Sequence, residues 1–272
     1  MKKSIFIVLM LLALGGGAVL AIVMRPPSAP KPQLSRSEQM ARDSARVREA
    51  EARAEREREA KFQSLIEDGK KKFYDGHDAN GALDILSDAV SLATSDAQKY
   101  EAFSWRAEVL DGLDDARQKS AGEMMRSLAH GDRELAGAYH VIARAEERIG
   151  EYRAAVSDYQ RASGYYVRAA MDEMAWLDLA QAARVAADGA RERAKAEKLW
   201  DEAWRVASQS RMTPEKRDAA LYQLCLDRAD MAANAKKWSD ELKWHREAAK
   251  YDKSHIKAAD ALEESLRVQR KI

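Results

Sequence analysis

Residues 139–162 contain two apolar stretches whose spacing allows little besides a pair of packed helices. Apolar side chains recur at steps of three and four residues in each stretch: Tyr139, Ile142 and Ala143, then Tyr152, Ala155, Tyr159 and Ala162. Such steps place each set on one face of a helix. Gly150 and Glu151 separate the two stretches and mark a turn. The segment therefore predicts a helical hairpin whose helices approach each other through small residues.

Helix start signals elsewhere in the chain predict further hairpins. Ser95 is followed three residues later by Gln98, which is the pattern of a capping box. Thr213 and Pro214 place an N-cap residue directly before a proline at the first helical position. Gly189 lies in a lengthened turn between two more apolar stretches. These signals divide residues 62–272 into about five hairpins.

The pattern at residues 139–162 resembles the tetratricopeptide (TPR) repeat, a helix–turn–helix unit of roughly 34 residues with a large–small–aromatic signature. The resemblance covers roughly residues 62–272 and is strongest in this third hairpin. It implies an all-α, TPR-like α-solenoid in which residues 256–268 form a C-terminal capping helix. The family motif is structural, so the resemblance implies a protein that binds other proteins and supplies no catalytic residues.

The composition agrees with a helical fold and argues against some partners. Glycine and proline are scarce, at 13 and 5 residues, which favours helices throughout the body. The 46 basic and 45 acidic residues leave a net charge of +1, which gives no drive toward nucleic acid. Cys225 is the only cysteine, so no internal disulfide can form.

Motifs that carry chemistry are missing from the sequence. The five histidines are scattered, and neither a metal-ligand spacing nor a Cys–His cluster is present. The chain has no glycine-rich phosphate loop and no Gly-x-Ser-x-Gly nucleophile elbow. We therefore expect no enzyme activity, no cofactor and no metal.

The N-terminal sequence predicts a transmembrane anchor or a signal sequence at residues 1–25. An uncharged run fills residues 4–24, which is long enough to cross a lipid bilayer, and residues 5–24 would contact lipid. A cleaved secretory signal is the alternative. Flanking positive charges favour a cytoplasmic body, whereas the Met-Lys-Lys start resembles a bacterial export signal. We expect a single-pass inner-membrane protein with its body in the periplasm or another extracytoplasmic space; the alternative is a soluble periplasmic protein.

Two connecting segments precede the predicted repeats. Residues 26–34 hold most of the prolines and predict an extended linker. Residues 35–61 are rich in Ala, Arg and Glu and predict a charged helical stalk, which begins at a capping box formed by Ser35 and Glu38. A weak oligomerising helix is the alternative for the stalk, because a few small or apolar residues recur every seven positions.

In TPR proteins the first helix of each unit lines a concave groove, so the resemblance also implies binding residues. In the third, fourth and fifth hairpins these are His140, Val141, Arg144, Glu147 and Arg148; Leu177, Asp178, Gln181 and Arg184; and Leu226, Asp227 and Asp230. We expect Arg144 and Arg148 to hold an acidic segment of a partner, while Asp227 and Asp230 meet a basic one.

Together these features predict a membrane-tethered, TPR-like scaffold or adaptor that holds a protein partner in an assembly of the cell envelope. The first alternative is a self-associating structural subunit of a large envelope machine, such as a secretion or motility complex. The second alternative is an enzyme, which no motif of the sequence supports.

Overall fold

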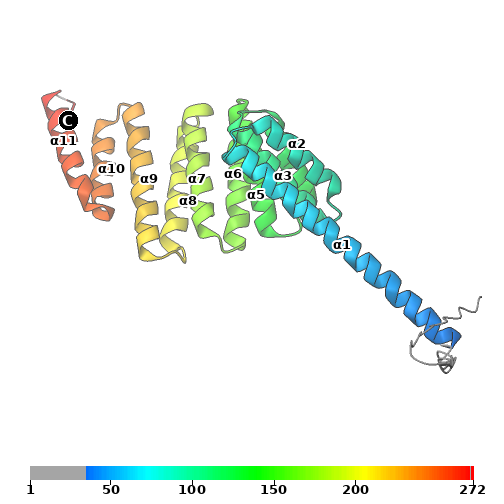
Figure 1. Ribbon diagram of the computed structural model, residues 1–272. Coiled ribbons are helices and arrows are strands. Elements are labelled where there is room, and N and C mark those ends of the chain that lie inside the picture. Colours follow the sequence, from blue (N-terminus) through cyan, green and yellow to red (C-terminus); the bar gives the residue numbers. More distant parts are fainter. Residues whose placement is uncertain (1–34, 270) are drawn as a thin grey trace, which may run out of the picture. The chain divides into compact units, whose positions relative to one another are not determined.

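The computed structural model describes residues 35–269 and 271–272, and every regular element in this part of the chain is a helix (Figure 1). The α-helices are α1 (Arg36–Tyr74), α2 (Ala79–Leu92), α3 (Asp96–Gly112), α4 (Arg117–Leu128), α5 (Asp132–Arg148), α6 (Tyr152–Arg168), α7 (Asp172–Arg184), α8 (Arg193–Gln209), α9 (Pro214–Asn234), α10 (Trp238–Tyr251) and α11 (Ile256–Val268). A π-helical segment (Val185–Gly189) follows α7, and a 3-10 turn (Lys253–His255) precedes α11. The predicted all-α class is confirmed for the described residues.

The chain divides into two units between Ala54 and Glu55. The described part of the first unit is the N-terminal portion of α1, whose side chains are all exposed. The predicted membrane segment at residues 5–24 and the linker at 26–34 lie outside the described residues. In the part that the structure describes, no helix is both long enough and apolar enough to cross a membrane.

Consecutive helices of residues 55–272 pack against each other in series, from α2 to α11. Figure 1 shows this order as a colour sequence from α2 to α11. Each helix contacts mainly its neighbours in the chain, which is the arrangement of a helical solenoid.

Two clusters of buried side chains hold the helices from α1 to α9 together. The first joins α1 to α5 and contains Phe62 and Leu86, each 1 % exposed. The second joins α5 to α9 and contains Trp200, which is 1 % exposed, and the fully buried Leu224. Alanines fill most of the remaining buried positions in both clusters, which lets helices approach closely around a few bulky residues.

Several helices begin where the sequence predicts. At the start of α1, the Ser35 amide donates to Glu38 Oε2 at 2.8 Å, and the Glu38 amide donates back to Ser35 Oγ at 3.3 Å. Ser95 and Gln98 form the predicted capping box of α3, and the Thr213 hydroxyl accepts from the backbone at the start of α9. These local hydrogen bonds satisfy amides that the first helical turn leaves unpaired.

The boundary predicted at residues 61 and 62 is not a break in secondary structure, because α1 runs through it without interruption. What changes there is burial: Phe62 is the first buried residue of α1. The lengthened turn predicted around Gly189 is the π-helical segment. A Cβ atom at Gly189 would lie 2.5 Å from the Tyr152 ring, so this segment needs a residue without a side chain.

Candidate cleft between α5 and α7

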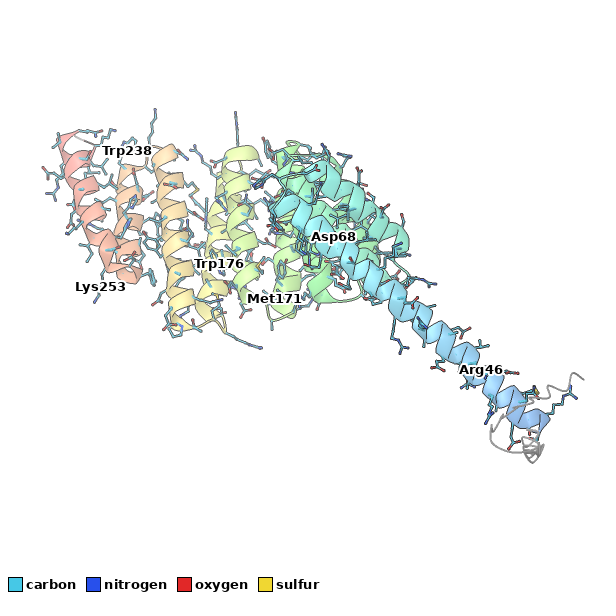
Figure 2. All side chains as sticks on the ribbon, viewed as in Figure 1. Arg46, Asp68, Met171, Trp176, Trp238 and Lys253 are labelled. Atoms are coloured by element: carbon cyan, nitrogen blue, oxygen red, sulfur yellow. The ribbon has the colours of Figure 1, made fainter. Side chains whose placement is uncertain are left out.

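An open cleft of about 550 Å³ lies between α5 and α7. These are the first helices of the third and fourth hairpins. Its lining comes from α5, α6 and α7: His140, Arg144, Glu147, Arg148, Tyr159, Met174, Leu177, Asp178, Gln181 and Arg184. Trp176, which Figure 2 labels on α7, is buried in the second core cluster instead. One face of α7 thus lines the cleft while the opposite face anchors the helix.

The structure brings most of the predicted groove residues together. The predicted residues of α7 all line the cleft, and so do those of α5 with the exception of Val141. Val141 packs against the first core cluster, where its Cγ1 would lie 3.0 Å from a Cβ atom placed on Gly122. It therefore faces α4.

The predicted residues of α9 do not line this cleft. Leu226 and Asp227 are half-buried, and Asp230 is exposed. Burial raises the pKa of the Asp227 carboxyl, while the charge of Arg184 lowers it in part. Arg184 of the cleft thus interacts electrostatically with Asp227 of α9.

Sequence reasoning missed two lining residues, Tyr159 and Met174. The repeat pattern places Tyr159 in the core of the third hairpin, and at 1 % exposure it is indeed buried, but it also forms part of the cleft lining. Met174 lies one turn before Leu177 and Asp178 on α7. The steps of three and four residues from Met174 to Leu177 and Asp178 could have placed it on the same face of the helix.

Arg144 and Arg148 already have carboxylate partners within the protein. Arg148 Nη2 lies 2.6 Å from Asp111 Oδ1, Nη1 donates to the buried Gln118 at 2.6 Å, and Nε lies 3.0 Å from Asp114. Arg144 Nη2 lies 2.7 Å from the second oxygen of Asp111. Because both guanidiniums share one carboxylate from α3, they tie α5 to the preceding hairpin, and their charges are neutralised from within.

Glu147 is satisfied by neutral donors. The Tyr159 hydroxyl donates to Glu147 Oε2 at 2.9 Å, and Gln181 Nε2 donates to both carboxylate oxygens at 3.0 and 2.9 Å. Burial raises the pKa of Tyr159, and the charge of Glu147 raises it further, so the hydroxyl stays protonated as a donor. Gln181 in turn accepts a hydrogen bond from Arg184. The chain of contacts crosses the cleft from α6 to α7.

His140 and Asp178 form the other polar contact across the cleft. His140 Nδ1 and Asp178 Oδ1 lie 2.7 Å apart, and Asp178 is only 1 % exposed. Burial raises the pKa of the Asp178 carboxyl, although the contact with His140 lowers it in part. Asp178 Oδ2 is buried and has no hydrogen-bond partner among the described residues. The contact fixes the imidazole ring, which remains partly exposed to the cleft.

Arg184 differs from the other two arginines of the cleft. It is exposed, and its one hydrogen bond to a described residue goes to the neutral Gln181. No carboxylate of the described residues lies within ion-pair distance of it. The cleft therefore ends in a guanidinium that has no carboxylate of the described residues at ion-pair distance, although its charge acts on the Asp227 carboxyl of α9 from farther away.

Within the described ranges, no group of three or more His, Cys, Asp or Glu side chains could hold a metal ion. What the lining offers is a row of fixed polar groups beside the apolar side chains of Met174 and Leu177. This combination suits the binding of a polypeptide segment.

No protein-family model matches the chain, and no curated protein matches it either.

Proposed function

We propose that this protein is a TPR-like scaffold that binds a segment of a partner protein in the cleft between α5 and α7. The observation that carries the proposal is the cleft itself: the first helices of two consecutive hairpins line it with one face each. In a helical series, those faces form a surface on which an extended or helical segment can lie.

The cleft is preorganised for such binding. Its polar side chains are held by hydrogen bonds to α3, α4 and α6, as the contacts of Arg148 and Glu147 illustrate. Side chains that are already ordered lose little entropy when a partner binds. Leu177, which is 39 % exposed, offers apolar surface among them. A partner can therefore gain contacts without a rearrangement of the scaffold.

The proposal includes the cellular setting that the N-terminal sequence favours. The uncharged run at residues 5–24 supports a single-pass anchor in the inner membrane, with the helical series on the periplasmic side. A scaffold of this kind would hold its partner beside the bilayer within an envelope assembly. Removal of the run as a secretory signal would leave the same scaffold soluble in the periplasm.

Site-specific photo-crosslinking in native membranes tests the proposal. A photoreactive residue replaces Leu177 in the cleft and, as a matched control, Val167 near the end of α6. Both side chains are exposed, at 39 % and 46 %, but only Leu177 lines the cleft. We expect a discrete crosslink to another protein from position 177 and none from position 167.

Two outcomes would contradict the scaffold. Equal crosslinking from both positions would show that the cleft has no special role. A crosslink from position 177 to a second copy of this chain alone would favour the self-associating subunit instead.

A further inference from the structure

The two ends of the cleft differ in chemistry along α7. Met174 and Leu177 give apolar surface at one end, and Arg184 stands at the other. Leu177 and Arg184 are seven residues apart on one helix, which corresponds to about 10 Å along its axis at a rise of about 1.5 Å per residue. A ligand that uses both ends must span this distance.

One arginine of the lining has no carboxylate of the described residues at ion-pair distance. Arg144 and Arg148 share Asp111, and Glu147 is held by Tyr159 and Gln181. The remaining arginine is Arg184, whose charge acts on Asp227 of α9 only from beyond ion-pair distance. An exposed guanidinium forms its strongest contact with a carboxylate, to which it can donate two parallel hydrogen bonds.

We propose that the cleft selects an extended partner segment with an apolar side chain for Met174 and Leu177 and an Asp or Glu carboxylate for Arg184, three or four residues away. This inference rests on the proposed function and names the chemistry of its partner. An extended chain advances about 3.3 Å per residue, so three or four residues cover about 10–13 Å, which matches the separation on α7.

The carboxylate belongs to a side chain within the segment, because a chain end bound along α7 would lack the donors that it needs. A chain end held in the cleft would need donors besides Arg184. The adjacent amide of Gln181 is not available, since it donates to both oxygens of Glu147.

Blocked synthetic peptides provide the test, with the full-length protein in detergent micelles at low ionic strength. The probes carry one leucine and one glutamate separated by two or three threonines, with acetylated and amidated ends and a fluorescent label. Matched probes replace glutamate with glutamine, or replace leucine with alanine, and a further probe carries glutamine with a free terminal carboxylate. Fluorescence polarisation gives the affinities.

We expect the glutamate probes to bind about fivefold more tightly than the glutamine probes, as one exposed charged contact provides. Arg184→Gln should remove this difference and leave the affinity for the glutamine probe unchanged. Arg211→Gln, which changes another exposed arginine outside the cleft, should preserve it. Replacement of the leucine of the probe by alanine should weaken binding to the wild type and to both variants alike, because Met174 and Leu177 are intact in all three proteins.

Equal affinities for glutamate and glutamine probes, or no peptide binding at all, would overturn the inference. So would a preference for the free terminal carboxylate. In each case a crosslink from position 177 to a partner protein would still support the proposed scaffold, so the two proposals fail separately.

Discussion

Gly122 shows how a single residue sets the packing of two helices. A Cβ atom on this residue of α4 would lie 2.8 Å from Ile142 Cγ1 and 3.1 Å from the Ile142 backbone nitrogen of α5. Ile142 is 2 % exposed, so neither atom can move into open space. The close approach of α4 and α5 therefore depends on the missing side chain.

Gly122→Ala should lower the free energy of unfolding by about 1–3 kcal/mol, because the added methyl group overpacks the contact with α5. Gly164→Ala in α6 is the matched control, since a Cβ atom there meets nothing within 4 Å. Alanine should stabilise that helix by about 0.5–1 kcal/mol. Denaturant unfolding of both variants measures the difference. A Gly122→Ala variant as stable as Gly164→Ala would show that α4 and α5 pack less tightly than described.

At the scale of residues, the sequence revealed which side chains share a helix face but not what they touch. The resemblance to the TPR repeat implied most of the cleft lining, from His140 to Arg184. The sharing of Asp111 by Arg144 and Arg148 could not be predicted, because it depends on how α3 packs against α5. For the same reason the predicted role of these arginines as a grip for an acidic segment stays a prediction, and Arg184 is the better candidate.

Two histidines connect the elements at the C-terminal end of the series. His245 Nδ1 of α10 lies 2.8 Å from His255 Nε2, and the other ring nitrogen of His255 lies 3.2 Å from the Tyr222 hydroxyl of α9. The two imidazoles are stacked. A hydrogen bond between two imidazoles requires that at least one of them is neutral. The contact thus joins α9, α10 and the turn before α11 only while at least one of the two imidazoles is neutral.

This contact predicts a pH dependence. Burial lowers the pKa of His245 below its usual value of 6.5, and the charge of His255 lowers it further, while Asp230 raises it in part. The unfolded state then binds the proton more readily than the folded state, so the stabilisation is complete above pH 6.5 and is lost as the pH falls through the lowered pKa.

We expect the wild type to lose more stability than His245→Gln between about pH 7.5 and about pH 5.5, because glutamine cannot take up the proton. Thermal unfolding across this range measures the effect. His77→Asn, at an exposed turn position between α1 and α2, should keep the wild-type profile. If His245→Gln shows the same pH profile as the wild type, the histidine contact does not control the C-terminal elements.

At the scale of elements, local signals predicted the helix starts well. Ser35, Ser95 and Thr213 cap the helices as expected, because capping depends on residues only three positions apart. Contacts between distant elements were not visible. Trp204 and Trp244 are 40 residues apart in the chain, yet their rings lie 6.4 Å apart between α8 and α10. No property of either segment alone identifies such a pair.

At the scale of the whole helical series, contacts between neighbouring helices replace a single central core. The first cluster joins α1 to α5, and the second joins α5 to α9. The order of helices was predictable, because alternating helices and short turns leave few ways to pack except in series. The division into two clusters was not, because it depends on which buried faces meet.

This division predicts that a destabilising substitution in one cluster loosens mainly the helices of that cluster. In a series of repeats, stability is approximately a sum of repeat terms and nearest-neighbour contacts. Leu86→Ala removes a buried side chain of the first cluster and should cost about 3 kcal/mol. Backbone amides of α2 and α3 should then exchange hydrogen faster, while those of α8 and α9 keep their protection. Leu224→Ala in the second cluster is the matched control and should show the reverse pattern. Hydrogen exchange followed by mass spectrometry measures both, and an equal loss of protection in all helices after either substitution would show that the series unfolds as one cooperative unit.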